Sequence, residues 1–121
     1  ILACGLMCAV AETAADLLAR QGLTVAVANL ATLKPLDDAG VIALARRFRT
    51  VVTAENHSII GGLGSAVAAC LLEAGVHVGF ERVGVRDCFA EGGSTPYLLA
   101  RYGLDANAVV AAFLRAHGRA A

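Results

Sequence analysis

The sequence predicts a three-layer α/β/α domain built on a mainly parallel sheet of four strands, and two observations lead to this fold class. Short apolar runs alternate with segments whose apolar residues recur at helical spacing, in the order strand, helix, strand, helix, strand, helix, strand, helices. Such alternation requires parallel pairing with right-handed crossovers. The strand-like runs are also almost continuously apolar, as expected when helices cover both faces of the sheet.

The amino-terminal half is predicted to contain two strands and two helices. Residues 1–4 are a short apolar strand, and residues 7–21 have apolar positions at helical spacing, with Gly22 as a fitting helix stop. The β-branched run 23–30 is bounded by turn residues and is predicted to be the second strand. Asp37 is the predicted N-cap of the next helix. The inward face of that helix is expected to comprise Val41, Leu44, Ala45 and Phe48.

The carboxyl-terminal half continues the alternation. Residues 50–55 are predicted to be the third strand and residues 65–74 the third helix. Residues 76–85 are the fourth strand, which is longer and more polar, as an outer strand would be. Pro96 opens a short helix to about residue 102, and Asp105 caps the last helix. The residues expected to pack this helix on the sheet are Val109, Val110, Phe113 and Leu114.

Composition and charge exclude several classes of protein. The 121 residues suffice for one domain, and 58% are hydrophobic while 17% are charged, so we expect a partner or further chain to cover some apolar surface. The alternative is an Ala-rich interior. Ten basic and ten acidic residues cancel, which argues against nucleic acid or an anionic membrane as the main partner. No apolar run is long enough to span a membrane, and the apolar start lacks the positive lead of a signal peptide.

The four cysteines do not form a recognisable metal or redox motif. Cys4, Cys8, Cys70 and Cys88 contain no CxxC pair, and no Cys/His set has zinc-finger spacing. We expect four reduced, buried or half-buried thiols in a cytoplasmic protein, with a redox or metal role as the alternative.

Residues 55–65, with the sequence ENHSIIGGLGS, join the third strand to the third helix. Gly61, Gly62 and Gly64 permit positive φ and close approach of another backbone. The helix start offers free N–H groups and a partial positive charge, so a phosphate cradle is physically possible. The spacing is not GxGxxG, however, and the Lys-Ser/Thr ending of a P-loop is missing. Close packing of the helix against a neighbouring backbone is therefore the favoured interpretation.

Polar residues in the same stretch allow a catalytic interpretation as well. His57 could act as a general base and Ser58 as a nucleophile, but adjacent residues rarely point at each other and no second acid is indicated. A structural or interface histidine is favoured. Glu55 is interpreted as a carboxylate that caps the helix or ties the loop. No residue is assigned as catalytic or as a metal ligand.

Three segments resemble a known family. GLMCAVAETAADLLARQGLTVAVANLATLKPLD (5–37) has a glycine, an alanine-rich helix, a glycine stop, a strand and a KPLD-type turn. TVVTAENHSIIGGLGSAVAACLLE (50–73) has a strand ending in an acid, then GGxG before a helix. ERVGVRDCFAEGGSTPYLLARYGLDANAVV (81–110) has a GVxDxF loop and a YGLD helix start. In this order they resemble the transketolase C-terminal domain, most closely that of split, two-subunit transketolase-like enzymes. Deoxyxylulose-phosphate synthases and the β subunits of 2-oxoacid dehydrogenases share the domain.

The resemblance implies that residues 1–121 are one domain of a larger cytoplasmic transferase of carbohydrate metabolism. Such a parent would use thiamine diphosphate and a divalent ion such as Mg²⁺ to move two-carbon ketol units between sugar phosphates. The family's GDG motif does not occur in these residues, so we expect no cofactor and no turnover in this domain alone. Expected partners are the remaining transketolase domains or subunit, and a second copy in a homodimer.

The resemblance also implies the order of the strands. The family's domain begins with an antiparallel edge strand, which we expect to be absent here, leaving four parallel strands in the order 2-1-3-4. Strand 1 would then be incompletely covered, and an uncapped edge could recruit another copy of the chain.

Ligands of doubly wound sheets bind outside the carboxyl ends of the strands, where the strand order reverses. That point lies between strands 1 and 3. The candidates for lining a ligand crevice there are Gly5, Met7, Glu55, Asn56, His57, Ser58, Gly61, Gly62 and Gly64. Two alternative functions remain open: a free-standing module that binds a nucleotide or phosphorylated ligand, and a docking domain of a 2-oxoacid dehydrogenase β subunit.

Overall fold

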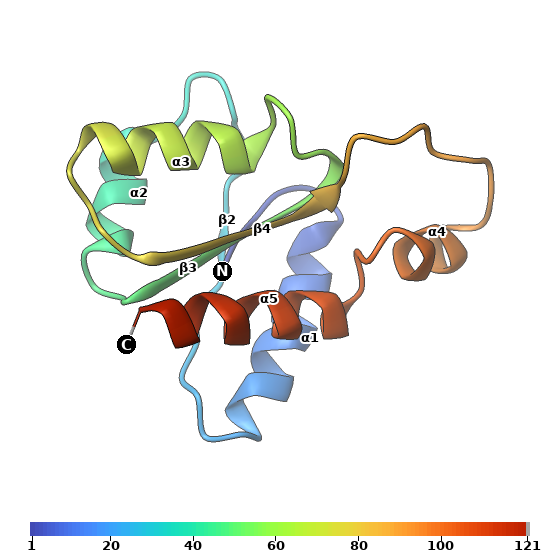
Figure 1. The fold of residues 1–121 in the computed structure, drawn as a ribbon, viewed down its shortest axis with the longest axis horizontal. Coiled ribbons are helices and arrows are strands. Elements are labelled where there is room, and N and C mark those ends of the chain that lie inside the picture. The colour runs from blue at the N-terminus through green and yellow to red at the C-terminus, as the bar shows by residue number, and fades with distance from the viewer. Residues whose placement is uncertain (121) are drawn as a thin grey trace.

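Four parallel strands form the central sheet, in the order β2-β1-β3-β4 (Figure 1). The structure is a computed structural model and describes residues 1–120. The predicted strand order is confirmed. The strands are β1 (Leu2–Ala3), β2 (Ala28–Asn29), β3 (Thr50–Ser58) and β4 (Gly79–Val85).

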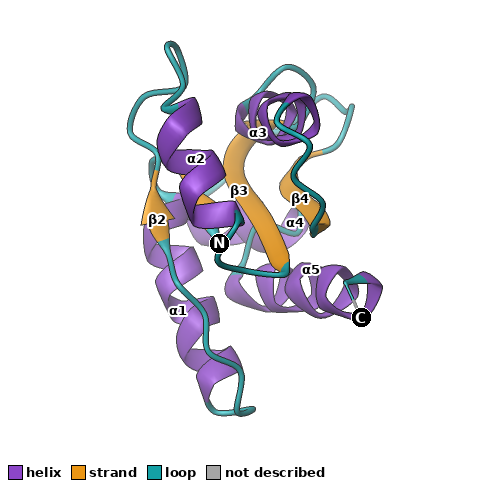
Figure 2. Ribbon diagram, turned by 90° about the vertical axis from the view of Figure 1, so that its left-hand side faces the viewer, coloured by secondary structure: helices purple, strands orange, loops and turns teal. Residues whose placement is uncertain are grey.

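Helices cover both faces of this sheet (Figure 2), so the predicted three-layer architecture is confirmed. On one face lie α1 (Met7–Ala19) and α5 (Ala106–Arg119), and on the other α2 (Asp38–Ala45) and α3 (Leu63–Glu73). The short α4 (Thr95–Arg101) lies beyond the carboxyl end of β4 (Figure 1).

Alternation of side chains along β3 divides the core into two clusters. Val52 and Ala54 pack with α1 and α5, whereas Val51 packs with α2 and α3, because successive side chains of a strand point to opposite faces. Helices α1, α2, α3 and α5 each contribute buried apolar residues to their cluster. The fully buried residues include Met7, Leu18, Val41, Leu63, Val67 and Val109.

The two predicted aspartate caps are confirmed. The Gly40 N–H donates to Asp37 Oδ1 over 2.9 Å at the start of α2. At the start of α5 the Ala108 N–H donates to Asp105 Oδ1 over 2.8 Å. Each aspartate satisfies a helix N–H that has no partner within the helix.

The predicted second strand, residues 23–30, is wrong over most of its length. Only Ala28–Asn29 form β2, because β1 offers only Leu2 and Ala3 as pairing partners. Residues 23–27 belong to no strand, although the α-amino nitrogen of Ile1 donates to the Ala26 oxygen over 2.7 Å.

Other predicted boundaries shift by a few residues. Strand β3 runs on to Ser58, which pairs with Val85 beyond an irregularity in register, and β4 begins at Gly79 instead of residue 76. Helix α2 ends at Ala45, so Phe48 lies outside it. At edge position β4 is flanked by a strand on one side only, as predicted for an outer strand.

Two expectations about burial are wrong. Strand β1 is not incompletely covered: residues 1–4 are all buried, because β1 lies between β2 and β3. The thiol of Cys88 is exposed, while Cys4 and Cys70 are buried and Cys8 is half-buried. Burial raises the pKa of Cys70 to about 11, so this thiol stays protonated at neutral pH.

Arginine side chains cover the outer edge of β4. Arg119 donates to the Phe80 carbonyl over 3.1 Å, and Arg86 donates to the Arg82 carbonyl over 3.4 Å. Arg119 and Arg115 also pair with Glu81. Partial burial would raise the pKa of Glu81, but hydrogen bonds from these two arginines outweigh it and lower that pKa.

No helix within residues 1–120 combines the length and apolar character needed to cross a bilayer.

The first prediction concerns Thr53, which is fully buried and whose hydroxyl has no hydrogen-bond partner. Thr53→Val removes the desolvation cost of that hydroxyl and is expected to raise the free energy of unfolding by about 1 kcal/mol. The matched control is Thr50→Val, because the Thr50 hydroxyl lies 3.2 Å from His117 Nδ1; it should lower stability by about 1 kcal/mol. Urea denaturation measures both, and a loss at Thr53 equal to that at Thr50 would contradict the assignment.

The second prediction concerns the buried α-amino group of a polypeptide that begins at Ile1. Desolvation lowers its pKa from 8.0 to about 6, so between these values the unfolded chain binds more protons than the folded chain. The free energy of unfolding should therefore rise by about 2–3 kcal/mol from pH 6 to pH 8 and level off outside this window. Urea denaturation across this range tests it, with the N-acetylated chain as control. The control keeps every histidine, so identical pH profiles would refute the prediction.

Candidate functional site

The carboxyl end of β3 carries a buried carboxylate. Glu55 is fully excluded from solvent. Its Oε2 accepts a hydrogen bond from the Leu63 N–H over 2.6 Å, and its Oε1 accepts one from the Gly64 N–H over 2.9 Å. Both donors belong to the first turn of α3, where N–H groups have no partner within the helix. The interpretation of Glu55 as a helix-capping carboxylate is confirmed.

Glycines make room for the Glu55 side chain. A Cβ atom on Gly62 would lie 2.0 Å from Glu55 Oε2, and one on Gly84 would lie 3.0 Å from Glu55 Cγ. Gly64 packs against Thr53 and the aliphatic part of Arg82 in the same way. The helix start thus approaches mainly side chains, and the neighbouring backbone that we expected is represented by the Ser58 carbonyl beside Gly62.

Positive φ is needed at one position of the cluster only. Gly61 has φ +73°, whereas Gly62 has an extended backbone and Gly64 is helical. The three glycines therefore serve two purposes: Gly61 turns the chain, and the other two leave space that a side chain would fill.

The first two N–H groups of α3 are not free to bind a phosphate. An anion bound by a helix N-terminus is held by the first N–H groups of that helix. In α3 the N–H groups of Leu63 and Gly64 are bonded to Glu55, and the negative charge that suits the helix dipole is already present.

His57 lies beside Glu55 and not beside Ser58. Its Nε2 is 2.6 Å from Glu55 Oε2, and the imidazole is 45% exposed. The Ser58 hydroxyl instead accepts a hydrogen bond from the Ile60 N–H over 3.1 Å. Glu55 and His57 are two residues apart on one strand and can meet on one face, but the serine is directed elsewhere. The geometry contains no Ser-His-acid relay.

Hydrogen bonds hold the loop between β3 and α3 in one conformation. The Ser65 hydroxyl donates to the Ile59 carbonyl over 2.9 Å and accepts from the Gly61 N–H over 3.1 Å. From β4, Arg82 donates to the Ile59 carbonyl and to the Ser65 hydroxyl. The exposed residues of the loop are thus presented on a fixed frame.

The remaining candidates divide between the surface and the core. Gly5, with φ +56°, lies next to Asn56, whose Oδ1 would be 3.7 Å from a Cβ on this glycine. These two residues therefore meet where the strand order reverses. Met7 is fully buried within the cluster under α1 and cannot line an open crevice. Apolar side chains are also exposed after the carboxyl ends of three strands, namely Leu6, Ile60 and Phe89.

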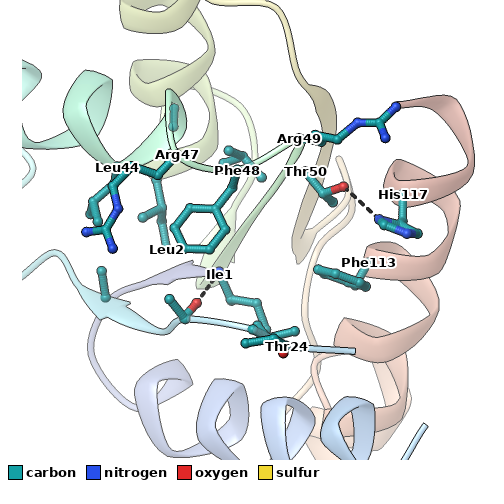
Figure 3. A pocket seen from close by; sticks show the side chains of 15 residues that line it. Ile1, Leu2, Thr24, Leu44, Arg47, Phe48, Arg49, Thr50, Phe113 and His117 are labelled. Atoms are coloured by element: carbon teal, nitrogen blue, oxygen red, sulfur yellow. Dashed lines mark hydrogen bonds between the residues drawn. The ribbon is translucent and has the colours of Figure 1, made fainter. Parts of the chain in front are cut away.

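An apolar cavity of about 230 Å³ lies at the opposite, amino-terminal end of the sheet. None of the nine candidate residues lines it. Its walls include Ile1, Thr24, Phe48, Phe113 and His117 (Figure 3). Sequence reasoning missed these residues because the cavity depends on where β1 begins relative to its neighbours, and pairing register is not visible in a single strand.

The described residues contain no cluster that could hold a metal ion. Within positions 1–120, no three His, Cys, Asp or Glu side chains come together.

The transketolase C-terminal domain model matches residues 1–109. The chain belongs to this family. It is 52% identical over 112 residues to the 6-deoxy-6-sulfo-D-fructose transketolase subunit SqwH of Clostridium sp. (strain MSTE9), covering 93% of this chain and 34% of that protein. It is 47% identical to a 1-deoxy-D-xylulose-5-phosphate synthase of Syntrophotalea carbinolica, covering 92% of this chain and 18% of the synthase.

A solved structure of a split-gene transketolase, described as an inactive beta4 tetramer, has the same fold. It superimposes with a TM-score of 0.86 at 45% sequence identity, covering 95% of this chain and 36% of that one. The chain thus spans about a third of the length of the first relatives that it matches. The resemblance stated from the three sequence segments is confirmed.

The third prediction tests the role of Glu55. Glu55→Gln replaces one carboxylate oxygen by an NH₂ group that faces other donors, and it removes the charge that complements α3. We expect the free energy of unfolding to fall by about 2–4 kcal/mol. The matched control is Glu73→Gln at the other end of the same helix, where the side chain is exposed and stability should change by less than about 0.5 kcal/mol. Equal stability of the two variants in urea denaturation would disprove the role.

Proposed function

We propose that this chain is the C-terminal domain of a thiamine diphosphate-dependent transketolase-type enzyme and that it supports assembly of the enzyme. The parent would transfer two-carbon ketol units between sugar phosphates. The observation that carries the proposal is the family match over residues 1–109, together with relatives about three times as long as the matched segment. Domains that complete the active site would then lie in the remainder of the parent or in a second subunit.

The described residues do not fit thiamine diphosphate or its divalent ion. A diphosphate needs free N–H or cationic donors, and the first two N–H groups of α3, those of Leu63 and Gly64, are bonded to the negatively charged Glu55. A divalent ion needs several oxygen ligands, and positions 1–120 contain no cluster of three acidic, histidine or cysteine side chains. We therefore assign no catalytic step to this domain, and we propose that cofactor and metal are bound elsewhere in the parent.

The assembly role is supported by the loop that follows the carboxyl end of β3. There the Glu55 contact and the Ser65 hydrogen bonds fix a loop whose tip, Ile60, is 64% exposed. A rigid loop that presents an apolar side chain loses little conformational freedom when a partner covers it. We propose that the partner is another domain or subunit of the parent, in a cytoplasmic homo-oligomer.

The two alternative functions have less support. A nucleotide-binding module would need the anion donors that Glu55 occupies. A docking domain of a 2-oxoacid dehydrogenase shares the family, but the relatives described above are transketolase and 1-deoxy-D-xylulose-5-phosphate synthase proteins.

The fourth prediction is a reconstitution. The purified 121-residue chain should show no ketol transfer, and activity should appear when the missing domains of its parent are supplied together with thiamine diphosphate and Mg²⁺. The donor sugars to test are a ketose phosphate and 6-deoxy-6-sulfo-D-fructose, and formation of 1-deoxy-D-xylulose 5-phosphate is measured in parallel. These assays separate the transketolase and synthase types of parent.

Two outcomes would count against the proposal. Turnover by the isolated chain would place catalysis within these residues. A well-folded complex with the missing domains that remains inactive in all assays would remove the chain from this enzyme class.

A further inference from the structure

A small cavity lies at the outer edge of the sheet, between β4, α5 and the turn that joins α4 to α5 (Figure 1). Its volume is about 170 Å³. The described residues that line it include three arginines, Arg82, Arg86 and Arg115, and no aspartate or glutamate. None of the nine crevice candidates borders it, so this cavity is separate from the place where the strand order reverses.

Helix α5 leaves room for the cavity. Ala108 and Ala111 lie three residues apart, and Arg115 follows four residues later, so the three side chains share one face of the helix. All three residues line the cavity. The two alanines end at Cβ and leave the space open, while the longer Arg115 brings a positive charge to it. Val83 and Gly84 of β4 form another part of the wall.

The outer edge of β4 offers backbone groups to the same space. The Val85 carbonyl accepts a hydrogen bond from the Ile59 N–H over 3.0 Å, on the side of β3. Backbone groups of successive residues in a parallel strand point to opposite sides. The Arg82 carbonyl accordingly points away from β3, where Arg86 binds it. Gly84 alternates in step with Arg82, so its N–H points to the outer edge, and this glycine has no side chain to cover it.

Arg86 and Arg115 have hydrogen-bond donors to spare. Each guanidinium carries five N–H donors, and both side chains are exposed. Arg115 Nη2 donates to Glu81 Oε2 over 3.1 Å, and Arg86 Nη2 donates to the Arg82 carbonyl over 3.4 Å. Arg119 pairs with Glu81 as well. Two arginines therefore share one carboxylate, which cannot neutralise both.

Size and donor placement limit what the cavity can hold. Sites for drug-sized molecules have volumes of about 300–1,000 Å³, so a volume of about 170 Å³ is too small for thiamine diphosphate and suits one small group. Arg86 follows the end of β4 and Arg115 belongs to α5, so cationic donors reach the cavity from two elements. Guanidinium groups pair strongly with phosphate, whose oxygens accept hydrogen bonds from several directions.

We propose that this cavity binds a single phosphate group, with Arg86 and Arg115 as the charged donors and the Gly84 N–H as a further donor. The group would come from inorganic phosphate or from a small phosphorylated metabolite, because both present the same oxygens. We assign no direct contact to Arg82, since its guanidinium binds the loop after β3. The inference goes beyond the proposed function, because the site lies within this domain and needs neither cofactor nor partner.

The test titrates the 121-residue chain with sodium phosphate, with sodium chloride adjusted to hold the ionic strength constant, and follows the backbone amides by NMR. We expect saturable shifts of the Gly84 and Gly103 amides, which belong to the cavity wall, at millimolar phosphate. Fructose 6-phosphate in a second arm identifies the source, with fructose as the neutral control. Tighter binding than that of inorganic phosphate indicates a phosphorylated metabolite, and equal or weaker binding indicates the free ion.

A matched pair of variants decides whether the arginines hold the anion. Arg115→Gln and Arg119→Gln each remove one partner of Glu81, but only Arg115 lines the cavity. Loss of one charged hydrogen bond should raise the Kd for phosphate about tenfold in Arg115→Gln. Arg86→Gln should weaken binding to a similar extent. In Arg119→Gln the Kd should stay within about twofold of that of the unchanged chain.

Shifts that grow linearly without saturation would mean an adventitious ion only and would overturn the proposal. Equal Kd values in Arg115→Gln and Arg119→Gln would overturn it as well. No arm measures ketol transfer, so failure here is distinguishable from failure of the proposed function.

Discussion

The structure at the carboxyl ends of the strands depends on the hydrogen bonds of the buried Glu55 carboxylate. A charge removed from water is tolerated only where donors satisfy it. The start of α3 supplies two N–H groups and the positive end of a helix dipole. The contact joins a strand in the centre of the sheet to a helix on its face. The loop from Ile59 to Gly62 takes its position from that junction.

Features set by local sequence could be predicted well. Helical spacing of apolar residues located α1, α2, α3 and α5, and Pro96 marked the short α4. Asp37 and Asp105 marked two helix starts because a cap lies within three residues of the N–H that it binds. The sequence predicted that another group approaches the glycine cluster closely, but it did not predict which group this is. It includes the Glu55 side chain, and Gly84 on another strand completes the space around it. Such long-range neighbours leave no periodic signal in the sequence.

The error over residues 23–30 has a related origin. The β-branched composition of this run favours an extended backbone, and that local preference was interpreted as a strand. A strand also needs a partner, and the ladder with β1 covers only Ala28 and Asn29. Pairing length is a property of two segments together. The same register determines the cavity beside Ile1, which the sequence did not indicate, because the search for a ligand site followed the point where the strand order reverses.

Strand β4 forms one edge of the sheet, and arginine side chains cover its outward side. This cover affects how readily the protein can aggregate through that edge. Arg119 and Arg86 occupy the outward carbonyls of Phe80 and Arg82. A foreign strand could reach those acceptors only by displacing cationic side chains, one of which is also tied to Glu81. Growth into cross-β fibrils is thereby blocked along this flank. A chain in which 58% of the residues are hydrophobic is thereby protected from edge-to-edge association by two side chains that contribute nothing to its core.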